Sequence, residues 1–216
     1  MSTGRATVID VHAPLTGAAA AQRWLTSAGE EYLADSLAVL NRVLHAYRLV
    51  TADPYSSPVG RAQALVARIG YGAGEQVADG LWTEARELLD SGPRPRRLKV
   101  LQPQARLAAV LGGRERVLAC EELALRARLD LDHGRDREAA LQVLVALDAA
   151  VAELAADPTA PALADRLDEL RAQREPVAAA AQAALAGPLN AEQRQVVEFT
   201  VGRIEAALRA RAVANA

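Results

Sequence analysis

The strongest electrostatic feature of the sequence is a basic segment between positions 94 and 116. Seven basic side chains fall there against one acidic residue, Glu115, so the segment has a net charge of +6 and the remainder −8. This asymmetry favours an anionic partner, whether nucleic acid, an acidic protein surface or the acidic remainder of the chain. No aromatic residue lies in the segment to stack on bases, which argues against single-strand recognition. The candidate anion- or nucleic-acid-binding residues are Arg94, Arg96, Arg97, Lys99, Arg106, Arg114 and Arg116.

A glycine-rich stretch, Gly70-Tyr71-Gly72-Ala73-Gly74, is the second feature that could carry chemistry. A strand followed by such a loop and a helix lets the backbone approach a nucleotide cofactor, as in methyltransferase-like enzymes. Arg68 stands where such enzymes usually carry an acidic residue, and Glu75 would place negative charge at the start of the helix. We therefore favour a flexible turn, assign no cofactor, and keep the cofactor loop as an alternative.

The other residue types that serve in catalysis or metal binding are sparse. Cys120 is the single cysteine, which excludes an internal disulfide and any metal site built from cysteines alone. The sequence has no nucleophile elbow and no Walker A loop. One polar cluster between two expected helices fails the spacing of a calcium loop: Asp130, Asp132, His133, Asp136 and Glu138. We expect no catalytic or metal-binding residues.

Most of the chain shows the apolar periodicity of helices, and alanine, the best helix former, is abundant. The first pattern runs from about 17 to 50, with an apolar stripe formed by Leu33, Leu37, Leu40, Leu44 and Tyr47. Residues 64–72 fit either helix or a short β element, and residues 75–89 are predicted to be helical. Later helices are expected over 104–110, 114–131 and 135–156, then from about 162, with a restart at Pro176.

The last helix should begin at Asn190, because Gln193 three residues later completes a capping-box pattern. Its stripe consists of Val197, Val201, Ile204 and Leu208. Both this stripe and the Leu33–Tyr47 stripe have the alternating spacing of a helix-pairing seam. We expect one of the two to form a contact between copies of the chain.

The chain should divide at a Pro-rich linker. We expect an N-terminal helical subdomain over 1–92, a basic linker over 93–103 and an Ala/Leu-rich helical subdomain over 104–216. All tryptophans and tyrosines precede the linker, so the first part can build an aromatic core while the second must pack small residues closely. The predicted fold class is mainly α, a multi-helix bundle of two packed helical subdomains with a short β element near 64–72 as an option.

Small residues recur at Ala127, Ala139 and Ala146, with Gly134 at the turn between two expected helices. On these residues, positions 120–153 resemble a single tetratricopeptide-type helical hairpin. The sequence departs from that pattern at Leu123, Arg126, Asp130 and Val151, and no second repeat follows. The resemblance implies a module that binds a peptide or a protein.

These observations favour a non-catalytic helical interaction, adaptor or regulatory protein that self-associates, whose partner is a protein or a second copy. The alternatives are a nucleic-acid-associated protein using residues 94–116 and a nucleotide-cofactor enzyme using residues 70–74. The most apolar stretch, 141–156, is interrupted by Asp148 and Glu153, so we expect no membrane insertion. The N-terminus lacks the pattern of a signal peptide, and we expect a cytoplasmic location.

Overall fold

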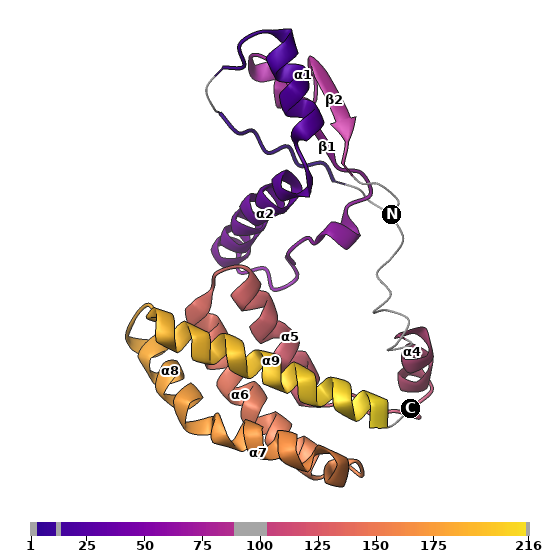
Figure 1. Ribbon diagram of the computed structural model, residues 1–216, viewed down its shortest axis with the longest axis vertical. Helices are drawn as coiled ribbons and strands as arrows, with labels where there is room; N and C mark the ends of the chain where they lie inside the picture. The colour runs from indigo at the N-terminus through magenta and orange to yellow at the C-terminus, as the bar shows by residue number, and fades with distance from the viewer. Residues whose placement is uncertain (1–3, 12–13, 89–102, 215–216) are drawn as a thin grey trace. The chain divides into compact units, whose positions relative to one another are not determined.

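The computed structural model describes residues 4–11, 14–88 and 103–214 (Figure 1). The chain forms two compact units, Met1–Pro93 (unit 1) and Arg94–Ala216 (unit 2). The described residues form eight α-helices and one two-stranded sheet, which confirms the prediction of a mainly α, multi-helix fold. Most of the predicted linker, 93–103, lies outside the described residues.

Unit 1 contains two helices and a small antiparallel sheet. Helix α1 spans Ala18–Ser27 and α2 spans Glu30–Thr51, while strand β1 (Arg68–Tyr71) pairs with β2 (Glu84–Glu87). Single 3₁₀ turns lie at Arg61–Gln63 and Glu75–Val77. The β element predicted near 64–72 is therefore present as β1.

The expected continuous helix over 17–50 is wrong, because the chain breaks at Ala28 and Gly29. Ala28 is extended, with φ −62° and ψ 127°. The guanidinium of Arg86 on β2 donates to the carbonyl oxygens of Leu25 and Ala28 at the end of α1. The Glu31 carboxylate accepts the Gly29 amide hydrogen at 2.9 Å, which satisfies a free donor at the start of α2. These contacts stabilise the break between the two helices. The apolar periodicity of the sequence could not have predicted the hydrogen bonds from Arg86.

The helix expected over 75–89 is also wrong. A single 3₁₀ turn is followed by Gly80, whose φ of +79° suits glycine, and then by β2. The two strands approach closely at Gly70, where an added Cβ would lie 2.6 Å from the carbonyl oxygen of Glu84. Pairing with β1 thus overrides the weak helical pattern of residues 84–87.

A small core with aromatic neighbours forms in unit 1, as the distribution of aromatic residues predicts. Leu25, Ala28 and Ile69 are buried, and Trp24 and Tyr32 pack beside them. The two rings meet edge to face with centroids 5.7 Å apart, and the Trp24 indole donates to the Tyr32 hydroxyl at 3.2 Å. This cluster joins α1, the start of α2 and β1.

Unit 2 is a helical bundle. Its helices are α4 (Pro103–Leu111), α5 (Ala119–Asp132), α6 (Asp136–Ala155), α7 (Ala164–Ala172), α8 (Arg174–Ala186) and α9 (Ala191–Ala214). A 3₁₀ turn, Ala160–Leu163, precedes α7. The predicted restart at Pro176 is confirmed, since this residue lies in the first turn of α8. Helix α5 begins five residues later than predicted.

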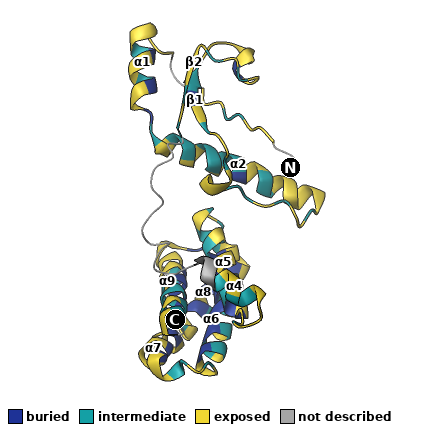
Figure 2. Ribbon diagram, turned by 90° about the vertical axis from the view of Figure 1, so that its right-hand side faces the viewer, coloured by how far each residue is buried: buried dark blue, intermediate teal, exposed yellow. Residues whose placement is uncertain are grey.

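Helix α6 lies at the centre of unit 2, packed against α5, α8 and α9. Figure 2 shows the buried residues concentrated in these helices. The core consists almost entirely of Ala, Leu, Val and Ile, with no aromatic residue among its buried members. Fully buried alanines such as Ala127, Ala139 and Ala146 let the helices approach closely. The prediction that this part packs small residues is confirmed.

Candidate functional site

The structure describes three of the seven predicted anion-binding residues. Arg106 on α4 forms ion pairs with Glu115 at 2.8 Å and with Glu121 at 2.6 Å. Arg114 and Arg116 lie exposed in the loop between α4 and α5. The other four, Arg94, Arg96, Arg97 and Lys99, lie outside the described residues. Arg106 is therefore bound to carboxylates of the same chain, and the Arg114 guanidinium donates to the Ala108 carbonyl oxygen at 3.5 Å.

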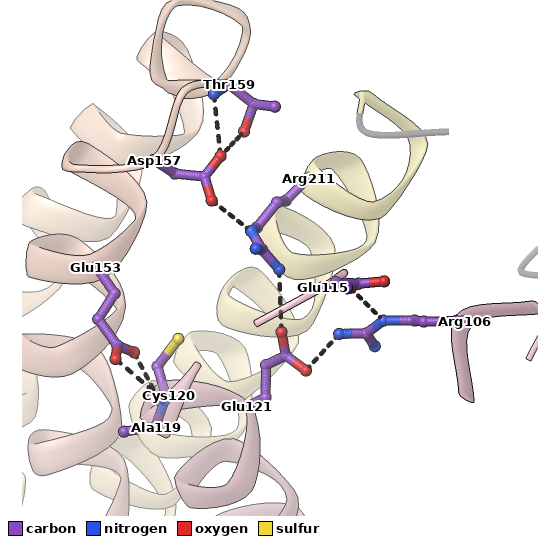
Figure 3. A network of polar contacts seen from close by, with 9 residues as sticks. All are labelled: Arg106, Glu115, Ala119, Cys120, Glu121, Glu153, Asp157, Thr159 and Arg211. Carbon is purple, nitrogen blue, oxygen red and sulfur yellow. Dashed lines mark hydrogen bonds and ion pairs between the residues drawn. The ribbon is translucent and has the colours of Figure 1, made fainter. Parts of the chain in front are cut away.

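Arg106 belongs to a chain of alternating charges that connects four parts of unit 2 (Figure 3). Glu121 on α5 also accepts Arg211 of α9 at 3.2 Å, and the Nε of Arg211 donates to Asp157 at 2.7 Å. Asp157 follows α6 and also accepts the Thr159 hydroxyl at 2.6 Å. The Arg211 side chain is only 7% exposed. The network ties α4, α5, α9 and the turn after α6 together.

These contacts stabilise the charged forms of the groups. Burial opposes ionisation of Asp157, but the hydrogen bonds from Thr159 and Arg211 outweigh it and lower the pKa of Asp157 to about 2. Hydrogen bonds to Glu115 and Glu121 raise the pKa of Arg106 above its ordinary value. A carboxyl ionised this firmly is unsuited to exchange protons near neutral pH.

A second carboxylate, Glu153 on α6, caps the first turn of α5. It accepts the backbone amides of Ala119 at 3.1 Å and Cys120 at 2.9 Å, which satisfies donors that the helix leaves free. Partial burial opposes ionisation of Glu153, but these two hydrogen bonds outweigh it and lower its pKa. Burial, together with the Glu153 carboxylate, raises the pKa of the Cys120 thiol to about 12. Burial and the neighbouring carboxylate therefore disfavour the thiolate, which is the nucleophilic form of cysteine.

The glycine loop does not form the geometry that a nucleotide cofactor needs. Residues 72–74 lie between antiparallel strands, and a single 3₁₀ turn stands where a helix was required. The loop therefore presents no helix N-terminus to a phosphate, and this alternative lacks its structural basis. In the described part of the chain, no three His, Cys, Asp or Glu side chains gather as metal ligands would.

The two predicted pairing stripes differ in burial. In α9, Val197, Val201 and Ile204 are fully buried in the core of unit 2. In α2 no member of the Leu33–Tyr47 stripe is buried, and Tyr47 is 56% exposed. Figure 2 shows α2 mostly in the colours of intermediate and exposed residues. The α9 stripe is therefore an internal contact of unit 2, whereas the α2 stripe has no member buried within unit 1.

Two exposed valines that the predicted stripe omits extend this side of α2. Val43 is 60% and Val50 is 87% exposed. They alternate with Leu33, Leu40 and Tyr47 at steps of 7, 3, 4 and 3 residues, and all five lie within about 100° of one another around the helix. These five residues are called the α2 apolar surface below. The apolar spacing in the sequence was sufficient to find the two valines. It does not show which side of α2 the rest of unit 1 covers.

Comparisons of this chain with protein-family models, curated proteins and solved structures found no match. The α5–α6 hairpin is present, with Gly134 at φ +67° in its turn. Its likeness to a tetratricopeptide unit remains a resemblance in sequence. No helix among the described residues is both long and apolar enough to span a membrane.

Proposed function

We propose that the chain is a non-catalytic helical interaction protein, of the adaptor or regulatory kind, that associates with copies of itself. The observation that carries this proposal is the α2 apolar surface, where Val43, Tyr47 and Val50 are each more than half exposed. Contiguous apolar residues on an exposed helix face are typical of interaction sites.

The contrast with unit 2 supports this proposal. There one side of α6 and the Val197, Val201 and Ile204 stripe of α9 are buried inside one core, although Val145 and Phe199 on the same helices are exposed. The charged groups of Figure 3 pair with one another. Unit 2 is thus held together by its own core and ion pairs, while unit 1 presents an apolar helix surface to a partner.

Multi-angle light scattering of the full chain over a concentration series tests the proposal. We expect the mass to rise from that of one chain, 22.9 kDa, toward that of two as concentration increases. A mass that stays at 22.9 kDa up to high micromolar concentration would refute self-association. The measurement should be repeated at high salt, because an apolar contact persists there whereas a purely ionic one is screened.

A further inference from the structure

We propose that α4 is a detachable helix, held on α5 by the ion pair between Arg106 and Glu121 and able to leave and unfold while the rest of unit 2 stays folded. This device lies in unit 2 and is independent of the self-association proposed above. Three properties of α4 support it: the absence of buried side chains in its described part, the polar contacts of Arg106 and the short length of the helix.

Apolar burial does little to attach α4 to the core of unit 2. Of residues 106–111, whose side chains the structure describes, none is buried, and none belongs to the hydrophobic core or packs against it. Leu107 and Leu111 are 58% and 79% exposed. By contrast, α5 contributes Ala124 and Ala127 to that core. Because hydrophobic stabilisation scales with the apolar area removed from water, it contributes little to the docking of this part of α4.

One ion pair joins α4 to another helix. The Arg106 guanidinium binds Glu121 on α5 at 2.6 Å and Glu115 in the following loop at 2.8 Å (Figure 3). The other hydrogen bonds that residues 106–111 make outside the helix go to the same loop; for example, the amides of Arg114 and Glu115 donate to the Ala109 carbonyl oxygen at 2.8 and 3.2 Å. Among the described residues, the polar attachment of α4 to the bundle therefore depends on the pair between Arg106 and Glu121.

Separation of Arg106 from Glu121 leaves neither charge without a partner. Arg106 keeps Glu115, which belongs to the loop that is hydrogen-bonded to the end of α4. Glu121 keeps Arg211 of α9 through its other carboxylate oxygen, at 3.2 Å. An ion pair costs most to break when one buried charge is left alone, and this separation leaves none. The Arg106 side chain is also 37% exposed, so water already reaches it in the docked state.

The length of α4 couples its release to its unfolding. The helix has nine residues, Pro103–Leu111, and isolated helices shorter than about 12 residues are marginal in water. The chain that follows is anchored at the start of α5, where Leu118 is buried and Glu153 accepts the amides of Ala119 and Cys120. Release should therefore expose the backbone amides of α4 to solvent and should not extend into α5.

Hydrogen–deuterium exchange of the full chain, resolved on peptides by mass spectrometry, tests the proposal. Peptides from α4 report on its release, and peptides from α6 report on the opening of unit 2 as a whole. Salt at about 1 M shortens the Debye length to about 3 Å and screens an exposed ion pair, so exchange in α4 should become about fivefold faster than at low salt. Exchange in α6 should stay unchanged, because its burial is apolar.

Two arginine substitutions provide the matched comparison. Arg106→Gln removes the ion pair with Glu121 and should accelerate exchange in α4 about fivefold at low salt. Added salt should then have little further effect, because the pair that salt screens is gone. Arg114→Gln removes the same charge from the same segment, but the Arg114 guanidinium donates only to the Ala108 carbonyl oxygen, at 3.5 Å, among the described residues. This control should leave exchange in α4 unchanged.

Every other outcome overturns the proposal. Exchange in α4 that responds neither to salt nor to Arg106→Gln means that a different contact holds the helix. Equal acceleration by Arg106→Gln and Arg114→Gln means that the net charge of the segment matters and not the pair with Glu121. Acceleration shared to the same degree by α6 means that α4 opens only when the whole of unit 2 unfolds. Exchange in α4 of the parent at the rate of an unfolded chain means that the helix is not docked.

Discussion

The helices α2 and α9 carry apolar stripes with the same alternating steps of three and four residues, yet the two units use them differently. In unit 2 the stripe of α9 packs against α5, α6, α7 and α8, and three of its four members are fully buried. In unit 1 no member of the α2 stripe is buried, and Asn41 is the one buried residue of that helix. Periodicity therefore shows that a helix has an apolar face, but the rest of the fold decides whether that face belongs to a core or to a partner.

The two units also differ in how far burial can stabilise them. Unit 2 surrounds α6 with a continuous core, whereas the buried apolar cluster of unit 1 consists of Leu25, Ala28 and Ile69. Both tryptophans, Trp24 and Trp82, lie in unit 1, while six of the eight described helices lie in unit 2. Tryptophan fluorescence therefore reports on unit 1, and far-UV circular dichroism reports mainly on unit 2.

The largest effect is expected from Leu147→Ala. Leu147 is fully buried on α6, so its truncation leaves a cavity and should lower the free energy of unfolding of unit 2 by about 4 kcal/mol. Urea unfolding followed by circular dichroism should show this loss, while the fluorescence transition keeps its midpoint. Leu49→Ala on α2 is the control and should change either transition by less than about 0.5 kcal/mol. Equal shifts of both probes after Leu147→Ala would mean that the units unfold together.

The second largest effect is expected from Arg211→Met. It removes the cation that pairs with Glu121 and Asp157 and leaves two carboxylates without it, at a cost of about 3 kcal/mol in unit 2. Arg209→Met is the control on the same helix. The Arg209 side chain is 57% exposed and its ion pair with Glu205 is long, at 3.9 Å, so it should contribute little to stability. The same urea titration measures both variants. Equal losses in free energy of unfolding would show that the buried ion pairs of Arg211 stabilise unit 2 no more than the exposed ion pair of Arg209.

Local signals were enough to predict much of unit 2. The helix expected over 135–156 is observed as Asp136–Ala155, since its apolar period and flanking turns are encoded within the segment itself. The start of α9 and the restart near Pro176 were predictable for the same reason. The α2 stripe was found from spacing as well, although spacing could not show that Asn41 is the one buried residue of that helix.

Contacts between distant residues explain what the sequence could not predict. Arg86 binds carbonyl oxygens at the end of α1, 58 and 61 residues away, and Glu153 caps the start of α5 from 33 and 34 residues away. Arg106 belongs to the predicted basic segment, but only the fold shows that its partners are Glu115 and Glu121. Nothing local to these residues identifies the partner.

The third largest effect on the stability of unit 2 is expected from a fall in pH. The pKa of Asp157 is about 2 in the folded chain against 3.8 as its ordinary value, so the native state resists its protonation. The resulting stabilisation, about 2 kcal/mol, is complete above pH 4 and is lost as the pH falls toward 2. Urea titrations of unit 2 at a series of pH values should show this decline. Asp157→Asn should be less stable at pH 7 and should decline less between pH 4 and 2; an unchanged slope would contradict the assignment.

The smallest effect is expected at the start of α9, where a local signal and the fold agree. The Asn190 side chain accepts the Gln193 amide at 2.8 Å, and the Gln193 side chain accepts the Asn190 amide at 2.9 Å. Asn190→Ala removes the first of these hydrogen bonds and should cost unit 2 about 1 kcal/mol. Asn190→Asp keeps the acceptor and adds negative charge at a helix N-terminus, so its unfolding transition should stay close to that of the parent. In unit 1 the N-cap of α1 is Gly17, which has no side chain to cap the helix. A loss in Asn190→Asp equal to that in Asn190→Ala would show that the start of α9 is set by core packing and not by its capping box.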